Sequence, residues 1–134
     1  MTRVPLCLAA LLLLVAVSAR AGTLSPDLDR KLSKLAPGAS LPVLVHLRER
    51  AAVERILAAQ KARGADLHER HREVILALRA AAASQHDLLS TLAGAKAQGA
   101  VTAYRSFWIT NLVSVTATRE MILQIAARPD VEVV

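Results

Sequence analysis

The stretch GAVTAYRSFWITNLVSVTATREMILQIAARPDVEVV, residues 99–134, decides the fold of this chain. It predicts, in order, a strand, a tight turn, a second strand, a short helix and a third strand. Val113 and Val115 alternate with polar residues, which is the pattern of a strand with one buried face. Thr118 can cap the helix and Pro129 ends it. This order predicts the second half of a split βαβ unit.

The residues upstream supply the strand and the helix that this unit still needs. From Ala51 to Ala93 the chain is expected to be helical, with a break at 63–65 and with Asp66 as the cap of the longer second part. We expect one apolar stripe of this segment to lie on the sheet, and Gly94 to end the helix. The four expected strands are 42–48, 100–107, 111–117 and 131–134.

The assembled order predicts the fold class. It is α+β, a ferredoxin-like (split βαβ) sandwich whose antiparallel sheet has helices on one face, with an extended helical arm. The core is expected to draw on the strands and on two helices, through Val43, Val45, Leu47, Leu88, Leu92, Val113, Val115, Ile122 and Ile125. The other face of the sheet stays open, and Leu44 and Leu112 make part of it apolar. An exposed apolar surface of this kind marks an interaction site.

The N-terminal residues predict a secretory signal peptide over residues 1–21. Arg3 is followed by an apolar run over 4–17, which is shorter than the roughly 20 residues that a membrane-spanning helix needs. Small residues follow, and Ala19 is an alternative to Ala21 as the last residue before cleavage. We therefore expect a secreted or periplasmic protein that has no membrane contact after signal cleavage.

Two regions follow the expected signal peptide. Residues 22–40 are expected to form an N-terminal helix and a linker, because Ser25 precedes a proline and an acidic residue. Residues 41–134 are expected to form the main domain. One domain fits a chain of 134 residues.

Composition and charge exclude several classes of function. The chain has 17 basic and 11 acidic residues, and loss of residues 1–21 leaves a net charge of only +4 because Arg3 and Arg20 are removed. A nucleic-acid-binding surface would need a basic stripe with interleaved aromatic residues, and the basic residues are instead mixed with acidic ones along the helices. Cys7 lies in the signal peptide, so thiol chemistry is not expected.

Catalytic motifs are not found in the sequence. His68, Glu69 and His71 resemble a zinc-protease helix, but that motif needs H-E-x-x-H and the spacing here is one residue too short. No G-x-S-x-G elbow and no glycine-rich phosphate loop occurs. We expect no enzyme, no cofactor and no bound metal, and a metal-dependent secreted enzyme built on these histidines is the weakest alternative.

Several pieces of the chain, in order and in spacing, resemble a known family. They are VLVHLRERA, Ser84-Gln85, the run Tyr104 to Ile109 followed by Asn111, Val113 to Thr118, and Arg128 to Val131. Together they resemble the N-terminal propeptide of secreted subtilisin-like serine proteases, particularly the bacillopeptidase F-like branch. The resemblance covers roughly residues 41–134.

The resemblance implies a partner and a function. In that family the propeptide folds as a ferredoxin-like domain, templates the folding of the protease and inhibits it until it is cleaved off. The expected partner is the catalytic domain of a subtilisin-like serine protease, with the open sheet face docked on two of its helices. The expected partner-binding residues are Tyr104, Phe107, Trp108, Asn111 and Glu120. Glu120 is expected to meet a helix N-terminus of the protease, and the aromatic residues can equally close the core.

The chain departs from the family pattern at Val134, where neither a protease domain nor the extended tail that lies in the active-site cleft follows. We therefore expect weak docking and incomplete inhibition, with the folding-template role less affected. The chain fits a fragment of a longer precursor, a truncated gene product or a stand-alone extracytoplasmic inhibitor. The alternative from another class of function is a cell-envelope adaptor, which would bind its partner through the helical arm over 51–93.

Overall fold

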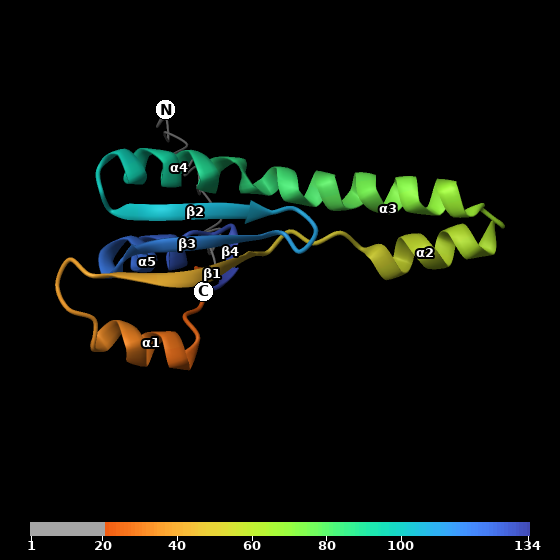
Figure 1. Cartoon of the computed structure of the whole chain (residues 1–134). Helices are drawn as coiled ribbons and strands as arrows, with labels where there is room; N and C mark the ends of the chain where they lie inside the picture. The colour runs from red at the N-terminus through yellow and green to blue at the C-terminus, as the bar shows by residue number, and fades with distance from the viewer. Residues whose placement is uncertain (1–20) are drawn as a thin grey trace, which may run out of the picture.

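The computed structural model describes residues 21–134 and shows an α+β fold with one four-stranded antiparallel sheet (Figure 1). The signal peptide expected over 1–21 lies, apart from Ala21, outside the described residues. No helix in the described part of the chain is long and apolar enough to cross a membrane. The elements in chain order are α1 (Pro26–Ser33), β1 (Ser40–Leu47), α2 (Val53–Ala62), α3 (Leu67–Ala82), η1 (Ala83–Gln85), α4 (His86–Ala97), β2 (Val101–Phe107), β3 (Leu112–Thr118), α5 (Arg119–Ala126) and β4 (Val131–Val133).

The strands lie in the order β2-β3-β1-β4, and every neighbouring pair is antiparallel. The four expected strands are thus all present, with ends that differ by at most two residues from the expected ones. Val45 of β1 pairs with Val113 of β3, so the residues with buried side chains on the two central strands share one face. Alternation along these strands places their other residues on the opposite face.

The core lies between the sheet and helices α4 and α5. All of the core residues expected from the sequence are buried. Thr118 caps α5 by accepting a hydrogen bond from the backbone N–H of Met121, as expected. Helix α1 adds Leu28 and Leu32 to the same core.

The residues before α1 run alongside the short last strand. Thr23 forms a parallel bridge with Val133. The N–H of Val134 donates to the carbonyl of Thr23 at 2.9 Å, and the N–H of Ser25 donates to the carbonyl of Val134 at 2.9 Å. The outer edge of β4 is therefore partly paired, and the strand is anchored from both sides.

Helices α2 and α3 form an arm that extends beyond the end of the sheet (Figure 1). The expectation that one stripe of residues 51–93 lies on the sheet is wrong for α3, which packs on α2 instead. Only Gln60, Ala65 and Ala81 are buried within residues 53–82, and Leu67 is 63% exposed. The sheet is shorter than the helical segment that follows β1. Of the helices in that segment, α4 is therefore the one that packs on the strands.

The break between the arm helices is where the sequence predicts it. Gly64 adopts a positive φ of 70°, and the N–H of Ala65 donates to the carbonyl of Gln60 at 3.0 Å. This is the Schellman arrangement that ends helices at a glycine. Asp66 then caps α3 by accepting from the backbone N–H of Glu69 at 2.8 Å.

Gly94 does not end α4, contrary to expectation. The helix continues to Ala97 and ends at Gly99, which has a φ of 81°. The N–H of Ala100 donates to the carbonyl of Ala95 at 3.0 Å, again in the Schellman arrangement. The side chain of Ala95, one residue after Gly94, is buried in the core, so ending the helix earlier would remove that packing.

Candidate functional site

The face of the sheet opposite α4 and α5 carries a row of partly exposed apolar residues. His46, Leu112 and Phe107 lie side by side across β1, β3 and β2, and Leu44 lies in the next row. Leu44 is 52% exposed and Phe107 is 37% exposed. We call this surface the open face, defined by Leu44, His46, Arg105, Phe107, Leu112 and Ser114.

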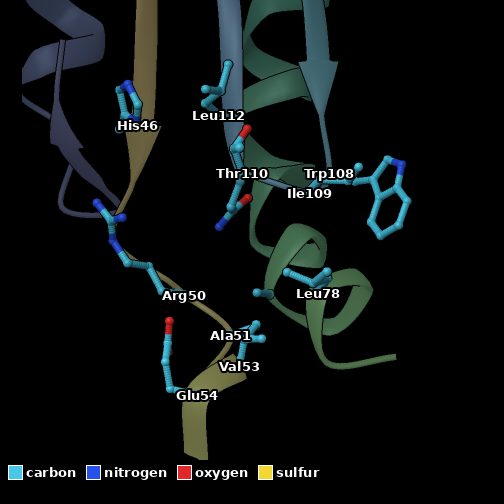
Figure 2. Close-up of a pocket in the computed structure, with 12 residues that line it drawn as sticks. His46, Arg50, Ala51, Val53, Glu54, Leu78, Trp108, Ile109, Thr110 and Leu112 are labelled. Carbon is cyan, nitrogen blue, oxygen red and sulfur yellow. The ribbon is translucent and has the colours of Figure 1, made fainter. Parts of the chain in front are cut away.

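A hollow of about 420 Å³ adjoins the open face where the sheet ends and the arm begins (Figure 2). We call it the corner hollow. The β2–β3 turn, helix α3 and the segment that joins β1 to α2 form its walls. Its lining includes His46, Arg50, Glu54, Leu78, Trp108, Ile109, Thr110 and Leu112. Leu78 projects from α3 toward the hollow, whereas the Trp108 indole lies on the outer side of the turn (Figure 2).

Two arginines stack on the aromatic residues of this region. The guanidinium carbon of Arg79 lies 5.6 Å from the centre of the Trp108 ring, and that of Arg105 lies 5.1 Å from the centre of the Phe107 ring. Such cation–π contacts hold a side chain in place at an exposed position. No salt bridge joins either arginine to a carboxylate within residues 21–134, so the aromatic residues are bordered by positive charge.

Arg50, in the wall of the corner hollow, forms an ion pair with Glu132 of β4. The hydrogen bond from Arg50 lowers the pKa of the Glu132 carboxyl below its usual value. Both side chains are largely exposed, so this pair contributes little to stability. Its effect on the site is to offset the charge of Arg50 and leave Arg79 and Arg105 as the cations beside the aromatic residues.

A buried amide cluster lies behind the corner hollow. Asn111 is 4% exposed, and its φ of 46° is one that asparagine tolerates. Its Nδ2 donates to the carbonyl of Glu49 at 2.7 Å and to Ser84 Oγ at 3.0 Å. Gln85 Nε2 donates to Asn111 Oδ1 at 2.8 Å and to the carbonyl of Phe107 at 3.2 Å. The cluster joins the ends of β1 and β2 to the turn between α3 and α4.

The structure separates the residues expected to bind the partner. Phe107 lies on the open face, and Trp108, which is 40% exposed, follows it in the turn. Asn111 is buried, and its amide forms hydrogen bonds with Gln85, Glu49 and Ser84, which gives it a structural role.

Tyr104 and Glu120 lie away from the open face. Tyr104 pairs with Val115, whose side chain is in the core, so the tyrosine points to the helix-covered face. A register shift between Val101 and Ala103 causes this, because the extra residue of a bulge reverses the alternation of the strand. Glu120 lines a hollow between α4 and α5, so neither residue lies on the open face, and a contact of either one with a partner stays a prediction.

The site contains residues that the sequence analysis did not single out. Arg105 stands two positions before Phe107 on one strand, so alternation alone places the two on one face. Arg79, Leu78 and Ile109 come together only through the arm and the turn, and no local pattern predicts that contact. The candidate zinc residues His68, Glu69 and His71 lie on the arm, and no group of three potential metal ligands occurs within residues 21–134.

Comparisons with known proteins assign no family. No family model matches the chain, and neither a curated protein nor a solved structure is significantly similar to it.

Proposed function

We propose that the chain is a propeptide-type inhibitor and intramolecular folding chaperone of a secreted subtilisin-like serine protease, and that its fold is the ferredoxin-like sandwich of that class. The strand order β2-β3-β1-β4 supports this fold, because helices join β1 to β2 and β3 to β4 as in a split βαβ unit. The observation that carries the functional proposal is the open face, where Leu44 and Phe107 are exposed beside Leu112.

The chemistry of the open face favours binding over catalysis. Its centre is apolar and its border carries Arg79 and Arg105, which suits a surface that packs on another protein. The positive border favours contact with carboxylates or with helix C-termini of the protease. This differs from the sequence-based expectation, in which Glu120 meets a helix N-terminus.

A folding-template role follows from the same surface. A domain that binds only the native form of the protease stabilises that form by mass action. The described part of the chain contains no cysteine, so its own fold depends on the core between the sheet and the helices. Refolding of a denatured subtilisin-like protease in the presence of the purified chain should therefore yield more active enzyme, assayed after the chain has been removed, while heat-unfolded chain should give no gain.

Direct binding gives a second test of the proposal. The chain, immobilised and mixed with a panel of mature subtilisin-like proteases, should retain at least one of them, and soluble chain should inhibit that enzyme. Trp108→Ala should weaken the binding by more than about tenfold while the circular dichroism spectrum stays unchanged. Absence of retention and of inhibition across the panel would contradict the proposal.

A cell-envelope adaptor that works through its arm is the second candidate. The exposed leucines Leu57, Leu67 and Leu76 on the arm favour it. The adaptor hypothesis predicts that substitutions on the open face leave partner binding intact. The inhibitor hypothesis predicts that such substitutions weaken binding, so this measurement distinguishes the two.

A further inference from the structure

We infer that the docking surface does not stop at the open face but continues through the corner hollow along one side of the arm, where an acid-bearing surface of the protease covers it. This inference rests on the proposed function and adds a second contact region to it.

An apolar stripe runs along α3 on one side of the arm. His71, Ile75 and Leu78 follow one another at spacings of four and three residues, which places them on one face of the helix. Leu57 of α2 lies beside this stripe, and with His71, Val74 and Ile75 it lines a shallow hollow of about 330 Å³. Leu78 also lines the corner hollow, so the stripe leads from the arm directly to the open face.

The arm has two chemically different sides. On one side Arg63 bridges Glu69 at 3.1 Å and also pairs with Glu73, so the charges there are satisfied within the chain. On the other side Ile75 is 42% exposed, next to the exposed Leu57. Two short helices with so few buried residues are marginally stable alone, so cover from a partner would stabilise the arm.

The position of this stripe relative to the sheet is fixed. Gln85 and Ser84, at the turn between α3 and α4, are held by the buried amide of Asn111. The two helices follow nearly one line in Figure 1, so the arm extends the sheet rather than folding over it. A partner seated on the open face therefore meets the stripe without any rearrangement of the arm.

The positive charges at this docking surface indicate what kind of surface covers it. Arg79 lies against Trp108 beside the junction between the open face and the stripe, and Arg105 lies on the open face against Phe107. Neither arginine has a salt bridge within residues 21–134. A second copy of this chain would bring the same arginines together across a two-fold interface, which is unfavourable. A protease surface that presents carboxylates next to a large apolar side chain complements both the charges and the corner hollow.

The test compares two neighbouring residues of α3 in the full chain. Ile75→Glu places a carboxylate in the stripe, and Leu76→Glu makes the same change at an exposed leucine outside it. Binding to the protease that the parent chain inhibits should weaken by more than about tenfold for Ile75→Glu and Arg79→Glu, and stay within about twofold for Leu76→Glu. Circular dichroism checks that each variant is folded.

A photo-reactive benzoylphenylalanine at position 75 or 76 provides a second measurement that does not depend on lost affinity. Crosslinks to the protease are expected from position 75 and not from position 76. If Leu44→Glu on the open face weakens binding while Ile75→Glu and Arg79→Glu do not, and if position 75 gives no crosslink, the arm contact is wrong and the proposed function stands.

Two further outcomes would also overturn the inference. If the parent chain binds no protease of the panel, the proposed function fails and this inference fails with it. If sedimentation shows that the chain forms dimers that Ile75→Glu dissociates and Leu76→Glu does not, the stripe is an interface between copies of this chain.

Discussion

Gln85 donates a side-chain hydrogen bond to Asn111 at 2.8 Å where the arm joins the sheet. Both side chains are buried, and they connect elements that lie far apart in the sequence. Because Asn111 also binds Glu49 and Ser84, one asparagine holds the end of β1, the β2–β3 turn and the start of α4 together. The position of the arm depends on this contact.

Asn111→Asp should therefore destabilise the chain although it changes only one group. The carboxylate cannot donate, so the carbonyl of Glu49 loses this hydrogen bond and the Ser84 oxygen loses the donor that it accepts from, both beside the buried Asn111. We expect a loss of about 1–3 kcal/mol or more in the free energy of unfolding, measured by urea titration. Gln98→Glu, the same change at the exposed end of α4, is the control and should stay within about 0.5 kcal/mol. Equal stability of the parent and Asn111→Asp would show that the cluster contributes nothing.

The sequence predicts the sheet and its core because period-2 alternation and helix caps are local signals. The predictions for Val113, Val115 and Thr118 are confirmed for that reason. The position of Tyr104 on the helix-covered face could not be predicted, because a bulge shifts the strand by one residue and nothing near Val101 indicates a bulge. The prediction for α3 is wrong because an apolar stripe along a helix does not specify whether the stripe faces a sheet or another helix.

Gly94 and Gly99 should respond oppositely to the same substitution. Gly94 lies inside α4, and a Cβ added there would meet no other atom within 4 Å, so Gly94→Ala should stabilise the chain by about 0.5–1 kcal/mol. Gly99 has a φ of 81°, so Gly99→Ala should cost about 1–2 kcal/mol despite the open space around it. Thermal unfolding of both variants measures this. Shifts of the same sign would contradict the assigned end of α4.

The arm should loosen at acidic pH. Hydrogen bonds from Gln60 and then Arg63 lower the pKa of the Glu73 carboxyl. A carboxyl with a lower pKa in the folded state stabilises that state above the unfolded pKa, and the contribution is lost as the pH falls through the folded value. Backbone amides of α2 and α3, corrected for intrinsic exchange, should therefore exchange faster at about pH 3 than at about pH 6.

Glu73→Gln is the control for this pH effect. It removes the titrating group while keeping a side chain of similar size, so the acceleration between the two pH values should become smaller. Identical protection of the parent arm at both pH values would show that Glu73 does not contribute to the packing of α2 on α3.

The central claim is that the open face docks on a subtilisin-like protease, and two exposed leucines on opposite layers test it most directly. Leu44 lies on the open face, whereas Leu123 lies on α5 in the helix layer. The measurement is the inhibition constant of the parent chain, Leu44→Glu and Leu123→Glu against the same mature protease. We predict that Leu44→Glu raises it by more than about tenfold and that Leu123→Glu leaves it within about twofold. Equal inhibition constants for Leu44→Glu and the parent would contradict the account.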